Sequence, residues 1–185
     1  VYSYSTDAAT SNSGWLRLTR SGNDFSAYYK ENESDPWVQH GSTRTHALLN
    51  GGYVGIIQMT GNTNGDFVSY WDNFYLDGNK IQFGSVNIGY YNFNDDDTGT
   101  GLDDGTSDTT NGTVVLSGGA CRITPSGAIR TSGDAGFFDQ PRWMVPDISG
   151  DHTVETSIQV SSVSPSEWRV SLFYWVDADN FIVVS

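Results

Sequence analysis

A chain of 185 residues can hold one large domain or two small ones, and its 37% apolar and 14% aromatic residues suffice for a hydrophobic core. Nine Lys and Arg against 22 Asp and Glu give a formal net charge of −13, which argues against nucleic acid or an anionic membrane as a partner. No stretch approaches the roughly 18 apolar residues of a membrane-spanning helix, so we expect no membrane insertion.

Period-two alternation, which is typical of β-strands, recurs along the chain, while helical periodicity is almost absent. Residues 15–30 read WLRLTR-SGND-FSAYYK, which predicts a hairpin whose Gly22 and Asn23 can adopt positive φ. Residues 53–59 (YVGIIQM) form an apolar run with the length of a buried strand. We place Trp15 and Trp143 in the core, because each lies inside an apolar strand.

Further strands are predicted in the second half of the chain. The triplet SGG separates TVVL from ACRIT, and Cys121, the single cysteine, is expected in the core as an inert thiol. Residues 152–160 (HTVETSIQV) alternate, with Val154 and its alternate neighbours on one face. Residues 167–176 (EWRVSLFYWV) are apolar on both faces, which indicates a central strand covered on both sides or facing a groove. About a dozen such strands favour an all-β, two-sheet antiparallel β-sandwich or jelly roll.

One long irregular stretch, Asn92–Gly112, is rich in Asp, Gly and Thr. A disordered linker between two domains is one interpretation of that composition. We favour a single domain over residues 1–185, because the pieces on either side are each too small to close a core.

Several segments resemble the concanavalin A-like lectin/glucanase superfamily. The first two, GWLRLTRSGNDFSAYYKENESDPWVQHGS and GGYVGIIQMTGNTNGDFVSYWDNFYLDG, are similar to the second half of such a domain. The segments QPRWMVPDISGDHTVETSIQV and WRVSLFYWVDADNFIVVS resemble its first half. GYYNFNDDDTGTGLDDGTSDTTNGTVVL is similar to the N-terminal strand and acidic loop of laminin-G-type jelly rolls. Residues 1–78 thus match the second half and 79–185 the first, in circularly permuted order.

The permuted order predicts how the two ends behave. Joining Ser185 to Val1 gives an uninterrupted strand, loop and strand, so we expect residues 180–185 and 1–6 to be ordered strands that lead into each other along one strand or through a tight connection. Three interpretations stay open: a closed permuted domain with adjacent termini, one repeat of a tandem array, or a subunit completed by strand exchange with further copies of itself.

The resemblance implies an extracellular role. We expect a secreted, non-catalytic module of a larger bacterial surface or polysaccharide-degrading protein, which binds a glycan or polysaccharide and serves in adhesion. The alternative is a structural repeat or filament subunit completed by strand exchange or head-to-tail continuity. Glucanases of this fold need paired carboxylates on one strand, and no E-x-D-x-E-like triplet occurs. The nearest pairs are Asp151 with Glu155 and Asp177 with Asp179. Lyase sites on related jelly rolls need grouped His, Tyr, Arg and Gln, and the three histidines show no such grouping along the sequence.

Candidate ligands for Ca²⁺ come from the acidic loop, because calcium takes six to eight oxygen ligands and this loop supplies several carboxylates between Gly turns. The candidate ligands are Asp95, Asp97, Asp103, Asp104 and, from the other part of the chain, Asp72. The laminin-G-like resemblance also implies calcium near this loop. A solvated acidic loop is the alternative, and Asp72 alternatively bonds backbone amides at a strand bend.

Candidate sugar-binding residues are tryptophans, because sugar rings stack their C–H faces on aromatic planes. Most aromatic side chains fill the core of a two-sheet protein. Trp37 at a loop edge, Trp71 beside Tyr70, and Trp175 on the doubly apolar strand are the predicted exposed platform.

The calcium hypothesis predicts a stability effect. Excess chelator should lower the melting temperature, because an ion that binds only the folded chain stabilises it. Thermal unfolding with and without EDTA, followed by circular dichroism, measures the shift, and coincident curves would contradict bound calcium.

Overall fold

The computed structural model describes residues 2–4, 11–47, 51–60, 68–81, 112–117, 120–125, 142–161, 168–177 and 180–184. These residues form strands and turns without a helix. The strands are β1 (Tyr2–Tyr4), β2 (Ser13–Ser21), β3 (Asp24–Lys30), β4 (Val38–Thr45), β5 (Gly52–Thr60), β6 (Ser69–Leu76), β7 (Asn79–Lys80), β8 (Gly112–Ser117), β9 (Ala120–Pro125), β10 (Arg142–Ile148), β11 (His152–Val160), β12 (Trp168–Asp177) and β13 (Asn180–Val184).

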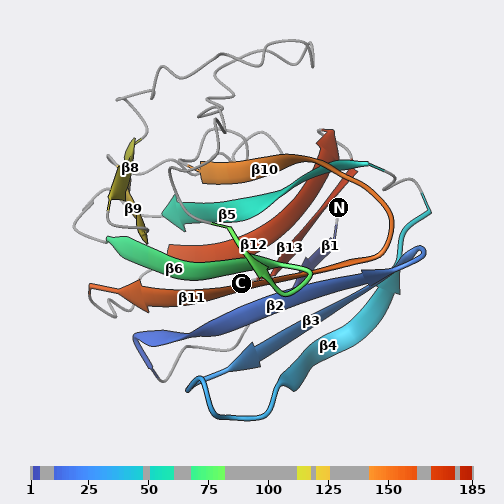
Figure 1. The fold of residues 1–185 in the computed structure, drawn as a ribbon, viewed down its shortest axis with the longest axis horizontal. Coiled ribbons are helices and arrows are strands. Elements are labelled where there is room, and N and C mark those ends of the chain that lie inside the picture. The colour runs from blue at the N-terminus through green and yellow to red at the C-terminus, as the bar shows by residue number, and fades with distance from the viewer. Residues whose placement is uncertain are drawn as a thin grey trace.

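The strands form two sheets (Figure 1). Sheet A has five strands in the order β1-β13-β12-β5-β10, and sheet B has eight, in the order β4-β3-β2-β11-β6-β9-β8 with β7 beside β6. Neighbouring strands are antiparallel except β1 and β13, which are parallel. The predicted all-β class with antiparallel sheets is confirmed. Both sheets contain strands from before and after the acidic stretch, and such strands pair directly, as β2 does with β11 and β5 with β12.

One hydrophobic cluster joins the inner faces of the two sheets. Sheet B contributes Leu16, Leu18, Phe25, Ala27, Trp71, Phe74, Cys121, Ile123 and Val154, and sheet A contributes Val54, Ile56, Trp143, Leu172, Tyr174, Ile182 and Val184. Burying one such leucine or phenylalanine contributes about 1.5–3 kcal/mol to folding. The core positions predicted for Trp143 and Cys121 are therefore confirmed.

Alternation decides which side chains enter this core. On β11, Val154, Thr156 and Val160 are buried and Ile158 packs partly buried against the core. The alternate residues Thr153, Glu155, Ser157 and Gln159 lie on the opposite face, as predicted. On β12 both faces are buried, since Leu172 packs in the cluster while Phe173 is buried on the opposite face. The predicted central strand is confirmed, because β12 lies between β13 and β5.

The predicted first hairpin is also confirmed. Strands β2 and β3 pair from Trp15↔Lys30 to Ser21↔Asp24, leaving Gly22 and Asn23 as the loop. Gly22 has a φ of +59°, which the first loop position of a two-residue hairpin requires.

The first and last described strands, β1 and β13, lie side by side. Tyr2–Tyr4 and Asn180–Val184 are strands, as expected, and they pair in the register Tyr2↔Ile182 to Tyr4↔Val184. Residues 1, 5, 6 and 185 lie outside the described residues. The pairing is parallel, so β13 does not continue into β1 along one strand, and that alternative is wrong. The other alternative, a tight connection between the two ends, stays a prediction.

Burial of Cys121 makes a testable prediction about its reactivity. The thiol is fully buried, and burial raises its pKa, so the reactive thiolate is scarce. We expect the folded protein to react with Ellman's reagent only as fast as it unfolds, and the denatured chain to react at once. Full labelling of the native protein on mixing would contradict this placement.

Candidate functional site

The outer face of sheet B, directed away from the core, presents tryptophan and basic side chains. On β2, Leu16 and Leu18 point into the core, so Trp15 and Arg17 project from the opposite face. The register places Lys30 of β3 directly across from Trp15 and places Glu155 of β11 across from Arg17. Three strands thus bring these four side chains together.

A short loop between β3 and β4 adds Trp37 to this face. The loop is fixed by its own hydrogen bonds, since Asp35 Oδ2 accepts from the Asn32 backbone N–H at 2.9 Å and from Asn32 Nδ2 at 2.8 Å. The Asp35 N–H donates in return to the Asn32 carbonyl at 3.1 Å. Pro36 restricts the backbone just before Trp37. This turn returns the chain toward β2 and β3.

Trp37, Trp15, Arg17 and Lys30 form what we call the tryptophan patch. The Arg17 guanidinium carbon lies 4.0 Å from the centroid of the Trp37 ring. Lys30 Nζ lies 4.7 Å from the Trp37 ring and 5.0 Å from the Trp15 ring. Each exposed cation–π contact of this kind contributes about 0.5–1 kcal/mol, so the contacts orient the rings.

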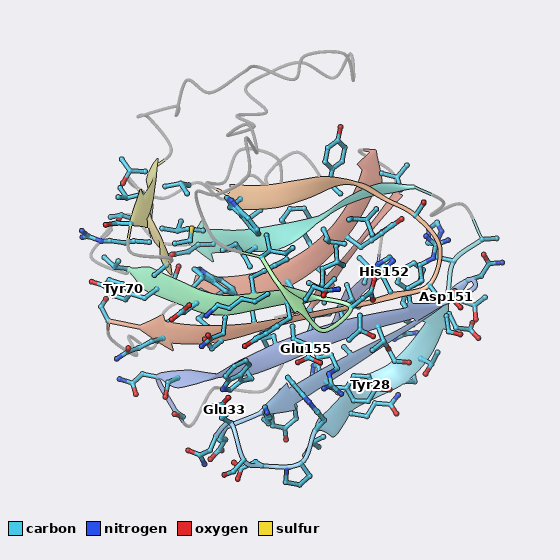
Figure 2. The ribbon with its side chains drawn as sticks, viewed as in Figure 1. Tyr28, Glu33, Tyr70, Asp151, His152 and Glu155 are labelled. Carbon is cyan, nitrogen blue, oxygen red and sulfur yellow. The ribbon has the colours of Figure 1, made fainter. Side chains whose placement is uncertain are left out.

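Acceptors hold both cations of the patch in place. Arg17 Nη2 lies 2.6 Å from Glu155 Oε1, and Lys30 Nζ donates to the Glu33 carbonyl at 2.5 Å. Figure 2 labels Glu155, Glu33 and Tyr28 on this part of the molecule. Both partners of the Arg17–Glu155 pair are about one quarter exposed, at 25% and 26%, so a ligand can reach them.

The structure gives a different result for each of the three tryptophans predicted to form the platform. Trp37 lies half-buried on the outer face of sheet B. Trp71 is fully buried in the core, where its Nε1 donates to the Ser69 hydroxyl at 2.8 Å, so its prediction as an exposed residue is wrong. The Trp175 side chain lies outside the described residues, although its backbone pairs with Tyr53 and Phe181 in sheet A.

Trp15 was assigned to the core, and this assignment is wrong. It alternates with Leu16, so it points out of sheet B. Sequence reasoning also did not single out Arg17 and Lys30. The signal was present, because fixing the hairpin loop at Gly22 and Asn23 sets Trp15 opposite Lys30.

Only one of the five predicted calcium ligands, Asp72, belongs to the described residues. Asp95, Asp97, Asp103 and Asp104 lie outside them. Asp72 Oδ1 accepts from the Asn73 backbone N–H at 2.5 Å, where Asn73 has a φ of 52° and the pairing with β11 is irregular. This is the strand-bend role given as the alternative for Asp72. Within the described ranges, no group of three or more His, Cys, Asp or Glu is arranged to hold a metal ion.

The carboxylates considered for catalysis have separate partners. Asp151 Oδ1 accepts from the Gly22 N–H at 2.5 Å, whereas Glu155 pairs with Arg17 on the outer face. Asp179 lies outside the described residues.

A group of His, Tyr and Arg does exist, contrary to the sequence analysis. Arg20 Nη1 donates to the Tyr174 hydroxyl at 2.9 Å, and the His152 ring stacks on the Tyr174 ring at 5.2 Å between centroids. The three residues come from β2, β12 and β11, so their distance along the chain hid the grouping. His152 is 4% exposed, Arg20 is 7% exposed and Tyr174 is fully buried.

This buried trio links the two sheets. The Arg20 Nε donates to the Gly22 carbonyl at 2.8 Å, and the Tyr174 hydroxyl donates to the Ile148 carbonyl at 3.3 Å. The guanidinium also lies 5.6 Å from the rings of Phe25 and Tyr174. Because a polymeric substrate has no access to side chains so deeply buried, we assign the trio a structural role. The tryptophan patch, whose side chains are half-buried on the outer face of sheet B, is the candidate site.

Comparison with models of known protein families, with curated proteins and with solved structures gives no match for this chain. In the part of the chain that the structure describes, no helix is long and apolar enough to span a membrane.

The trio predicts a pH dependence of stability. Burial, followed by the positive charge of Arg20, lowers the pKa of His152 below its ordinary 6.5, although the bond from Nδ1 to the Gly150 carbonyl opposes this. The unfolded chain then binds more protons, so the stability contributed by neutral His152 is complete above pH 6.5 and is lost as the pH falls toward the folded-state pKa.

Urea unfolding at a series of pH values measures this loss. His152→Gln, which keeps a polar side chain without a titrating group, should show a weaker fall in the free energy of unfolding below pH 6.5. Parallel curves for the wild type and the variant would contradict the assignment.

Proposed function

We propose that this chain is a non-catalytic glycan-binding module of a secreted or surface-located bacterial protein, built on a permuted concanavalin A-like jelly roll. The observation that carries the proposal is the tryptophan patch, where two indole rings and their cations stand on the outer face of sheet B. The two-sheet architecture with one shared core is compatible with the jelly roll, and the segment resemblances supply the permuted order.

The patch suits sugars chemically. An indole ring offers a flat apolar surface to the C–H face of a sugar, while Arg17 and Glu155 offer donors and acceptors for hydroxyl groups. The rings and the ion pair are held by the sheet and by the Asn32–Asp35 turn before any ligand arrives. Such preorganisation reduces the entropy that binding costs.

Adhesion to a polysaccharide surface follows from this assignment, and the net charge of −13 does not oppose binding of a neutral polysaccharide. Calcium bound by Asp95, Asp97, Asp103 and Asp104 remains part of the proposal as a stabilising ion, with the melting experiment as its test. The rival role, a filament subunit, predicts sedimentation as polymers, whereas a binding module sediments as a small species.

Substituting Trp37 tests the glycan site. Affinity gel electrophoresis with xylan, hydroxyethylcellulose, laminarin and polygalacturonate immobilised in the gel measures retention. We expect retention by at least one neutral polymer, and Trp37→Ala should weaken it about tenfold, or about 1.4 kcal/mol, while the fold is kept. Trp37→Phe should retain part of the affinity, because it keeps an aromatic face.

Tyr29→Ala is the matched control. Tyr29 is an exposed aromatic residue on the opposite side of β3, the side that carries buried Phe25 and Ala27. Its loss should leave retention unchanged. Equal retention of wild type and Trp37→Ala on every polymer, or no retention at all, would refute the proposed function.

A further inference from the structure

A second aromatic–cation pair lies on the same face of sheet B. Tyr70 of β6 and Val115 of β8 are 43% and 48% exposed, and Arg122 of β9 lies between them in the register. The Arg122 guanidinium carbon is 5.9 Å from the centroid of the Tyr70 ring. We call these three residues the tyrosine patch. Tyr70 is labelled in Figure 2 near the start of β6.

Both patches project from one face. Tyr70 alternates with buried Ser69 and Trp71, so it points away from the core, as Trp15 does. The register continues from Trp15 to Ser157 of β11 and from Ser157 to Asp72 of β6. Tyr70 is two residues from Asp72 along the same strand.

The register gives the separation of the patches. Two strand spacings and two residues of rise put the Cα atoms of Trp15 and Tyr70 about 12 Å apart, since antiparallel strands lie about 4.8 Å apart and rise about 3.4 Å per residue. One sugar ring is too short to contact both patches. A chain of several linked sugars can do so.

Polar side chains occupy the surface between the patches. Gln159 lies beside Tyr70, Ser157 beside Trp15, and Asn73 donates from Nδ2 to the Ser157 hydroxyl at 3.2 Å. Amide and hydroxyl groups can act both as donors and as acceptors in hydrogen bonds with sugar hydroxyls. Strand β7 pairs with Tyr75 and Leu76 of β6, farther along that strand than Tyr70 and Asn73.

The charges on this face indicate a neutral ligand. Arg17 is paired with Glu155, and Lys80 lies 3.7 Å from Asp72 Oδ1 and donates to Asn73 Oδ1 at 2.7 Å. Lys30 donates to a backbone carbonyl. Arg17, Lys80 and Lys30 thus have acceptors, Arg122 lies against the Tyr70 ring, and the net charge of −13 repels a polyanion.

We propose that the glycan site extends across sheet B from the tryptophan patch to the tyrosine patch and binds a linear, neutral polysaccharide over several consecutive sugars. This inference rests on the proposed function. Tyr70 forms the far contact, and the polar groups of β11 and β6 contact the sugars in between.

The dependence of affinity on chain length tests the inference. Isothermal titration calorimetry uses xylo-, cello- and laminari-oligosaccharides from the disaccharide to the hexasaccharide, with oligogalacturonides of equal length as the acidic comparison. For at least one neutral series, Kd should fall about tenfold or more between the disaccharide and the hexasaccharide. Tyr70→Ala should abolish this gain and leave disaccharide binding unchanged, whereas Trp37→Ala should weaken binding at every length.

Two controls accompany the titrations. Tyr70→Phe keeps the ring and should keep the gain with length, and Tyr29→Ala, a tyrosine of similar exposure (38%) on the other side of the sheet, should behave as wild type. Circular dichroism verifies that each variant is folded.

The outcomes separate the two proposals. Binding that depends on Trp37 but is equal for short and long oligosaccharides, or unaffected by Tyr70→Ala, overturns the extended site and leaves the glycan module standing. Tighter binding of oligogalacturonides than of every neutral series, or no binding by any neutral series, overturns the neutral class. If Trp37→Ala leaves the affinity unchanged for oligosaccharides of every length, the proposed function itself is refuted.

Discussion

The antiparallel pairing of β2 with β11 is the contact on which the rest of the structure depends. It runs over eight residue pairs, from His152↔Arg20 to Gln159↔Ser13, and joins two segments more than a hundred residues apart in sequence. Leu16 and Leu18 then face the core together with Val154. The same register sets Arg17 against Glu155 on the outer face, so core and candidate site are fixed by one set of backbone hydrogen bonds.

Side chains of the same type are buried or exposed on these strands according to which face of the sheet their position in the alternation gives them. Arg20 is buried and bonds Tyr174, whereas Arg17, three residues earlier, lies against Trp37 at the surface. Because successive strand residues point to opposite faces, a shift of one residue would exchange the two sets. The cost of burying Arg17 and exposing Leu16 and Leu18 makes that shift unfavourable, and this protects the geometry of the surface patch as well as the core.

Local sequence was sufficient to predict the strands whose pattern is set by residues close together in the chain. The alternation in β11, the doubly apolar β12 and the hairpin around Gly22 are each set by neighbouring residues, so they could be predicted. The tryptophans were harder. Trp15 lies in a segment that is apolar on average, and only its parity relative to Leu16 shows that it faces out. Trp71 was expected outside on the basis of its alternation with Tyr70, but that alternation places Trp71 in the core and Tyr70 outside.

The sequence by itself determined the all-β class, the positions of most strands and the strongly acidic character, because these depend on composition and on contacts between near neighbours. Only the tertiary structure decided which distant residues meet. It brought Arg20, His152 and Tyr174 into one buried trio, set the chain ends in parallel, and placed Tyr70 and Arg122 on the same face as Trp15 and Trp37. Strand order and register between segments far apart in sequence are set by how two whole faces pack, and no local pattern encodes that choice.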